Sequence, residues 1–141
     1  MKPIPKTKNA LVLRTDFSNQ AIWKEICEVI RELVGDAHFL AYVDFVDNVE
    51  YADISKEQLM KLIPKDYNHT FIILADQVAI SHPDHPLLII DLHNGSGRDF
   101  RAIPSQIQGI ENNLSIANMD FEEFADSVDE DGVFRGFERG D

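Results

Sequence analysis

Aspartates end or follow four apolar segments of this sequence, at positions where a folded sheet would gather them. They are Asp16, Asp44, Asp76 and Asp91. Residues just beyond the carboxyl ends of parallel strands commonly face a ligand crevice. If the strands before Asp16 and Asp76 are parallel neighbours, their carboxylates share one rim and could bind a cation or act as an acid/base pair. The alternative, which we favour, is that Asp16 caps the first helix and Asp76 caps a turn.

Three histidines lie close together in the middle of the chain. His82 and His85 belong to the segment HPDHP at residues 82–86, and His93 follows the next apolar segment. Paired imidazoles often bind metal, but a zinc site needs three or four converging ligands. The flanking prolines favour a rigid hairpin loop. With Asp16 and Asp76, these histidines define one alternative hypothesis, a metal-dependent, hydrolase-like enzyme.

Residues 127–138 match most of the calcium loop of an EF-hand. The loop needs acids at its third, fifth and twelfth positions and glycine at its sixth. Here these positions hold Asp129, Asp131, Glu138 and Gly132. Ser127 replaces the charged ligand of the first position, and Arg135 places a cation at the ninth. We therefore favour an acidic helix end followed by a glycine turn, and keep calcium binding as an alternative.

An asparagine-rich segment at residues 111–118 precedes the acidic tail. Glu111, Asn112 and Asn113 carry side chains that bond backbone groups or ligands equally well. We expect an irregular, polar loop between residues 110 and 118. It either satisfies its own main chain or presents these three side chains to a partner, and both interpretations stay open.

The first half of the chain predicts strands and helices in alternation. A buried strand at residues 10–14 precedes a helix whose apolar positions run from Ile22 to Leu33, with Ser18 or Asn19 as its cap and Gly35 as its end. A strand follows at residues 39–46. Ser55 and Gln58 have capping-box spacing and open a short helix up to Ile63. Residues 70–74, apolar on both faces, predict a central strand.

The second half predicts an antiparallel meander and a final helix. The meander consists of short apolar segments at residues 78–80, 87–92 and 100–103, joined by turn-rich connections. From Asp120 to Val128 a capping box with Glu123, a staple between Met119 and Phe124 and one apolar face predict a helix. The sum is one α+β domain at residues 9–141, a mixed sheet covered by two or three helices, with residues 1–8 as a flexible basic arm.

Composition excludes several classes of function. The chain has 141 residues, a net charge of −12 and no long cluster of lysine or arginine, so nucleic acid is not an expected ligand. No run approaches about 18 apolar residues, so we expect no membrane span, and no apolar signal segment follows the charged first residues. The single cysteine, Cys27, is expected to be a buried core residue. We therefore expect a cytoplasmic protein.

Four blocks of the sequence resemble a small bacterial domain family of unknown function. They are LVLRTDFS at residues 11–18, HPDHPLLIIDL at 82–92, GIENNLSIANMDFEEFA at 109–125 and DEDGVFRGF at 129–137. The resemblance implies a stand-alone domain that includes the acidic tail. It supplies no activity, cofactor or catalytic residue.

The leading functional hypothesis is a non-enzymatic binding module without a cofactor. Residues 120–141 hold nine acids and two arginines, so the acidic helix and the preceding asparagine-rich loop suit a protein partner with a basic surface. The oligomeric state is left open. The enzyme with strand-end aspartates and histidines, and the calcium site with Asp129, Asp131 and Glu138, are the alternatives.

Overall fold

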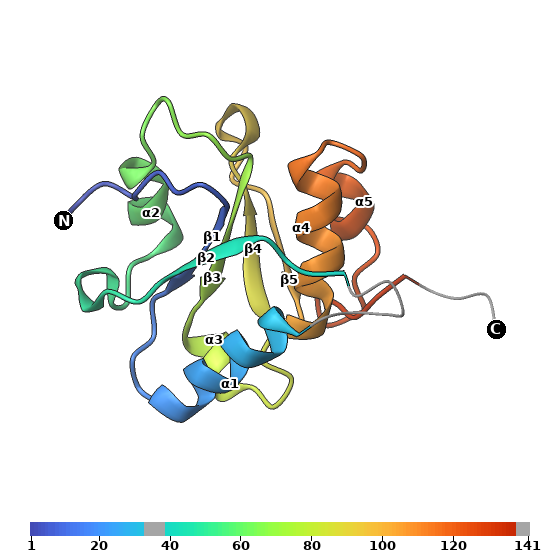
Figure 1. The fold of residues 1–141 in the computed structure, drawn as a ribbon, viewed down its shortest axis with the longest axis horizontal. Helices are drawn as coiled ribbons and strands as arrows, with labels where there is room; N and C mark the ends of the chain where they lie inside the picture. Colours follow the sequence, from blue (N-terminus) through green and yellow to red (C-terminus); the bar gives the residue numbers. More distant parts are fainter. Residues whose placement is uncertain (33–38, 138–141) are drawn as a thin grey trace.

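The computed structural model describes residues 1–32 and 39–137. In it, six strands form one mixed sheet in the order β2-β1-β3-β4-β5-β6. Helices pack on both faces of this sheet (Figure 1). The predicted α+β class, with one mixed sheet, is confirmed. None of the helices in the described ranges is long and apolar enough to cross a membrane.

The parallel half of the sheet has β1 (Ala10–Arg14) at its centre. Its neighbours β2 (Val43–Val46) and β3 (Phe71–Ala75) both run parallel to it. The chain passes from β1 to β2 through α1 (Gln20–Arg31) and from β2 to β3 through α2 (Lys56–Leu62). The strands at residues 10–14 and 70–74 are therefore parallel neighbours, and their carboxyl ends share one rim of the sheet.

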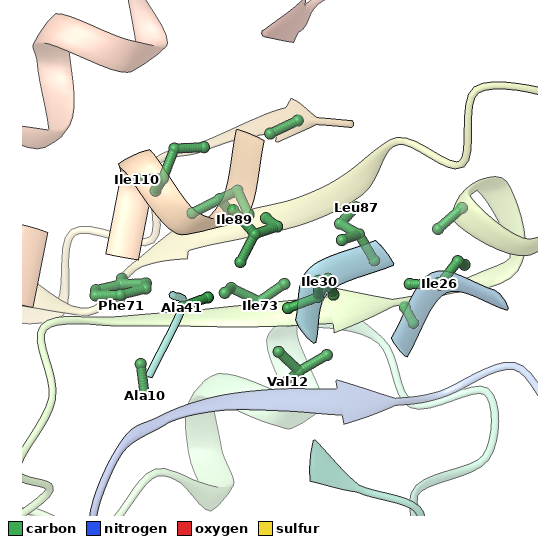
Figure 2. Packing of buried hydrophobic residues seen from close by; sticks show 14 of the residues in the cluster. Ala10, Val12, Ile26, Ile30, Ala41, Phe71, Ile73, Leu87, Ile89 and Ile110 are labelled. Atoms are coloured by element: carbon green, nitrogen blue, oxygen red, sulfur yellow. The ribbon is translucent and has the colours of Figure 1, made fainter. Parts of the chain in front are cut away.

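Alternating side chains of these strands build two apolar layers. Val12 and Ile73 lie on the same face as Ile26 and Ile30 of α1 (Figure 2). Leu11, Leu13, Ile72 and Leu74 lie on the other face, where Leu59 of α2 packs on them. Because side chains point to opposite faces with a period of two, a strand buried on both faces is apolar throughout.

Side-chain caps explain where α1 and α2 begin. The Asn19 side chain accepts a hydrogen bond from Ile22 N–H and caps α1, and Ser55 with Gln58 forms the predicted capping box of α2. The helix end predicted at Gly35 lies outside the described residues. Three short 3-10 helices complete the described connections: η1 (Val49–Tyr51), η2 (His93–Gly95) and η3 (Pro104–Gln106).

The antiparallel half consists of β3, β4 (Leu87–Asp91) and β5 (Asp99–Ala102). The antiparallel strands predicted at residues 87–92 and 100–103 are confirmed, but the third strand of the meander is β3 and not residues 78–80. A two-residue strand, β6 (Val133–Phe134), adds to β5 in parallel. The sequence did not indicate β6, because two residues carry no detectable alternation.

The strand predicted at residues 78–80 is wrong. These residues lie in a short helix, α3 (Gln77–Ser81), whose first turn is capped by the Asp76 side chain at 3.1 Å from Ala79 N–H. Three apolar residues fit a buried helical turn as well as a strand, and the Asp cap decides between them.

The irregular loop predicted at residues 110–118 is also wrong in its larger part. Residues 107–115 form α4 (Ile107–Ser115), which buries Ile107, Ile110, Glu111 and Leu114. These positions have the spacing of one helix face. Glu111 occupies an apolar position in that face, and this interruption hid the helical period.

The acidic C-terminal helix is confirmed as α5 (Phe121–Ala125), shorter than the predicted residues 120–128, and its capping box is present. Phe121 and Phe124 are buried against Phe100 of β5, with ring centroids 5.1 and 6.3 Å away. The aromatic contacts hold the acidic face of α5 in a fixed position beside α4 (Figure 1).

Residues 1–8, the expected flexible arm, lie against the face that carries α2. Ile4 is buried, and its N–H donates to the Leu62 carbonyl at 2.8 Å. The Tyr51 hydroxyl donates to the Pro3 carbonyl at 2.9 Å. The arm contributes an apolar side chain to the second core layer.

Candidate functional site

Asp16 and Asp76 lie at the shared rim of β1 and β3, as the parallel arrangement requires, but each has partners of its own. The Asp16 carboxylate accepts hydrogen bonds from the N–H and the hydroxyl of Ser18, in the turn before α1. Asp76 caps α3 and accepts two hydrogen bonds from the Arg101 guanidinium, at 3.0 and 2.8 Å. Asp76 is therefore a cap, as we favoured, although it caps the helix α3 and not a turn. The helix cap that we expected at Asp16 is wrong, because Asn19 caps α1 and Asp16 bonds the turn before it.

Arginines pair with three of the acids near this rim. The pairs are Arg14 with Asp47, Arg101 with Asp76, and Arg135 with Asp84. A cavity of about 210 Å³ beside the β1 and β3 ends is lined by Thr15, Asp53 and Asp76, among others. Arg101 neutralises Asp76 in this cavity, whereas Asp53 is exposed and forms no ion pair with a described residue.

The three histidines do not converge. His82 and His85 precede β4 and His93 follows it, so the five residues of that strand, about 16 Å at 3.3 Å per residue, separate them. His82 Nδ1 accepts from Asp84 N–H, and His85 Nδ1 lies 2.9 Å from the Ala79 carbonyl oxygen. Among the described residues, no three His, Cys, Asp or Glu side chains are placed to hold a metal ion. The geometry that the enzyme hypothesis requires is absent from this part of the chain.

The calcium-like loop contains its own cation. The Arg135 guanidinium donates to the Asp129 carboxylate at 2.8 Å and to both oxygens of Asp131, at 3.1 and 2.8 Å. The Val133 carbonyl, which an EF-hand would turn to calcium, accepts from Asp129 N–H at 2.9 Å. Glu138, the third predicted ligand, lies outside the described residues.

These contacts shift two pKa values. Hydrogen bonds from Arg135 lower the pKa of Asp131 below its ordinary value of 3.8, and the bonds to Asp131, Asp129 and Asp84 raise the pKa of Arg135. Each hydrogen bond favours the charged form of both partners. At neutral pH the Arg135 cation therefore offsets part of the negative charge of the loop.

Polar side chains of the asparagine-rich segment form hydrogen bonds with other groups of the protein. Glu111 is buried, and its Oε1 accepts hydrogen bonds from Tyr42 N–H at 2.7 Å and from the Asn112 side chain at 2.8 Å. The Asn112 amide also donates to the Leu40 carbonyl, and the Asn113 amide donates to the Gly109 carbonyl within α4. Glu111 and Asn112 thus fasten α4 to the segment before β2.

Another pocket lies at the opposite end of the sheet, where α4 turns into α5. This pocket, named the α4–α5 pocket below, has a volume of about 260 Å³. Its apolar walls come from Phe71, Leu114, Ala117, Met119 and Phe121. Its polar groups are Thr70, Asp91, His93, Asp120 and Glu122.

Asp91 is the deepest acid of the α4–α5 pocket. It pairs with Phe71 across the β3–β4 ladder and is only 8% exposed. Its Oδ1 accepts a hydrogen bond from His93 N–H at 3.0 Å. Among the described residues that line the pocket, none is lysine or arginine. Arg98 neutralises Glu122 at 2.6 Å, and no ion pair to a described residue involves Asp91 or Asp120.

Sequence reasoning indicated parts of this pocket only. His93 was a candidate for a different role, and Asp91 stood out as a strand-end acid. Its walls come from β3 and from α4 with the turn after it, so that Phe71 and Leu114 meet although they lie more than 40 residues apart in the chain. The signal that could have indicated the pocket is Asp91, an acid at the end of the otherwise apolar strand β4. It lies on the face of the sheet that α5 covers.

Comparisons with known proteins place the chain in a family. A search of curated proteins found no match. A search of family models matched residues 9–137 to a family described as a domain of unknown function, DUF6924. The matched residues include β1 to β6 and the acidic helix α5. Because the match covers most of the chain, this protein belongs to the family DUF6924, a domain of unknown function.

Proposed function

We propose that the protein is a non-enzymatic module that binds a basic segment of another protein at the α4–α5 pocket and the acidic surface of α5. The observation that carries the proposal is the contrast between the two ends of the sheet. Arginines pair with three acids near the β1–β3 rim, and the buried Asp16 there is bonded by Ser18. In the α4–α5 pocket, which no described lysine or arginine lines, Asp91 and Asp120 form no ion pair with a described residue.

Electrostatics favours a basic partner. The chain has a net charge of −12, and Asp120, Glu123 and Asp126 are exposed along α5 and at its two caps. Complementary charge mainly speeds association and selects against acidic partners, and salt screens it. The interaction is therefore expected to weaken steeply as salt is added.

Apolar contacts supply the rest of the surface. Phe71, Leu114, Met119 and Phe121 line the pocket, and Ile116, at the end of α4, is 75% exposed. Exposed apolar side chains next to a pocket are typical of protein-binding sites. A partner segment that mixes basic and apolar residues fits this surface better than a purely basic one.

A bacterial, cytoplasmic setting belongs to the same proposal. The resemblance of the four sequence blocks supports the bacterial origin. The single cysteine, buried in the core, suits a reducing compartment. The partner would then be a cytoplasmic protein with a basic segment.

The proposal is tested with a fluorescent peptide of alternating lysine and leucine. Binding is measured at about 0.01 M and about 0.15 M salt, where the Debye length is about 30 Å and about 8 Å. We expect binding that weakens with salt and falls about tenfold or more in Asp120→Lys. The matched control, Glu25→Lys on the exposed face of α1, makes the same charge change away from the pocket.

Two results would count against the module. One is no binding of this peptide at low salt. The other is an equal loss of affinity in Asp120→Lys and Glu25→Lys, which would mean that net charge alone attracts the peptide. An alternating glutamate–leucine peptide is expected not to bind.

A further inference from the structure

We propose that the α4–α5 pocket receives one lysine or arginine side chain of the partner, with Asp91 binding the cationic head group. This inference rests on the proposed function, and it adds the residue that anchors the complex. Its starting point is a buried carboxylate with one unused oxygen in an apolar pocket.

The position of Asp91 is set by the strand. Side chains of β4 alternate, and Leu87 and Ile89 lie in the core layer beneath α1 and α4. Asp91 continues this alternation, so its side chain lies on the same face of the sheet. The Asp91 side chain therefore lies beside Phe71, its partner on β3, and both line the pocket.

One carboxylate oxygen of Asp91 is free to bind a ligand. Oδ1 accepts from His93 N–H, and Oδ2 makes no hydrogen bond to a described residue. Within residues 1–32 and 39–137, the Tyr67 hydroxyl is the only side-chain polar atom that is both inaccessible and without a partner. Oδ2 is therefore accessible, and the pocket that Asp91 lines is where it meets solvent.

A buried carboxylate is stabilised by a cation, and the surrounding residues do not supply one. The Arg98 guanidinium pairs with Glu122 at 2.6 Å. The backbone carbonyl of Arg98 accepts a hydrogen bond from Asp91 N–H at 2.8 Å. The described acids and histidines do not form a metal-binding group. The cation that suits Asp91 is therefore an organic one from a partner.

The shape of the pocket favours a long basic side chain. Lysine and arginine lay their methylene groups along apolar surface and keep the head group in polar surroundings. Here Phe71, Leu114 and Phe121 provide that surface, and Asp91 lies at the inner end. The volume of about 260 Å³ is below the roughly 300–1,000 Å³ of pockets for larger small molecules, and it suits a single side chain.

The first experiment compares variants in the peptide assay described above. Asp91→Asn keeps the oxygen that accepts from His93 but removes the charge, and Glu25→Gln removes an exposed charge on α1. We expect Asp91→Asn to lose about tenfold or more in affinity, and Glu25→Gln to lose less than about twofold. A second variant, Ala117→Phe, narrows the pocket without changing charge and is expected to weaken binding as well. Thermal unfolding of each variant verifies that it folds.

The second experiment uses small probes on the full chain. Titration with n-butylguanidinium or n-butylammonium, followed by NMR, is expected to shift the amide signals of Phe71, Asp91, His93 and Ala117. The neutral n-butanol is expected to leave them in place, and Asp91→Asn is expected to abolish the shifts. These probes need no partner protein.

The outcomes separate the two proposals. If the peptide binds wild type and Asp91→Asn equally, or if butylguanidinium shifts the pocket signals no more than butanol does, the anchor role of Asp91 is overturned and the binding module stands. If wild type does not bind the peptide but the cationic probes shift the pocket signals through Asp91, the cation pocket is supported and the protein partner is overturned.

Discussion

At the scale of single residues, Arg135 changes what the acidic loop can do. The spacing of Asp129, Asp131 and Gly132 is that of a calcium loop, yet the guanidinium bonds both carboxylates. It also bonds Asp84 in the loop before β4, at 2.9 Å. One arginine thus ties the end of β6 to two turns, and a divalent cation would have to displace it.

The first prediction concerns calcium. Titration of the protein with calcium up to about 1 mM, the range of weak extracellular-type sites, is expected to produce no binding heat. The reason is that Arg135 occupies the oxygens of Asp129 and Asp131, and Ser127 supplies no charge. Isothermal titration calorimetry measures this directly. Saturable heat that disappears in Asp129→Asn would contradict the prediction.

The second prediction concerns pH. Arg135 lowers the pKa of Asp131 in the folded state, so this contact stabilises the fold fully above the ordinary value of 3.8. The stabilisation is lost as the pH falls through the lower, folded-state pKa. The Tm difference between wild type and Asp131→Asn is therefore expected to be constant near neutral pH and to shrink in acid. Thermal unfolding across this range measures it, and a difference that grows below pH 3.8 would oppose the assignment.

At the scale of elements, α4 shows why one polar residue misleads a periodic pattern. Ile107, Ile110 and Leu114 face the core, and Glu111 shares their face as a buried carboxylate. Its hydrogen bond from Tyr42 N–H holds the chain just before β2. Together with the bond from the Asn112 amide to the Leu40 carbonyl, this contact joins the helix to the segment before the sheet edge.

The third prediction tests this contact. Glu111→Ala leaves Tyr42 N–H without its acceptor and is expected to destabilise the fold by about 1–3 kcal/mol. Glu111→Gln keeps an acceptor oxygen and is expected to retain more of the stability. Urea unfolding of both variants against wild type gives the two values. Equal losses in both would show that the charge of Glu111 matters and the acceptor does not.

At the scale of the whole molecule, negative charge opposes folding as well as favouring a basic partner. A net charge of −12 on 141 residues is self-repulsive, because the acids outnumber the lysines and arginines that could pair with them. Most of the ion pairs involve exposed side chains, and such pairs contribute about 0–1 kcal/mol each. The general repulsion is expected to outweigh them.

The fourth prediction follows from this balance. Raising salt from about 0.01 M to about 0.15 M shortens the Debye length from about 30 Å to about 8 Å and weakens the repulsion. The Tm is expected to rise, by about 3 °C for each kcal/mol gained in a chain of this size. Differential scanning calorimetry measures the change. A Tm that falls with salt would show that the ion pairs dominate.

Local chemistry made much of the fold predictable. Asn19 and the Ser55–Gln58 capping box mark two helix starts, and the apolar residues 10–14 and 70–74 mark the central strands. Short segments were not predictable in this way. Residues 78–80 fit a strand or a helical turn, and the capping bond of Asp76 decides it.

The sequence by itself determined the α+β class, the two central strands and the position of the acidic helix. These follow from caps, periodicity and apolar runs, which act between residues close in the chain. Only the tertiary structure decided which charges are neutralised. Arg101 meets Asp76 and Arg135 meets Asp84 across the fold, whereas Asp91 lines a pocket with no lysine or arginine among its described residues. Electrostatic pairing acts through space, so the order of residues along the chain does not reveal it.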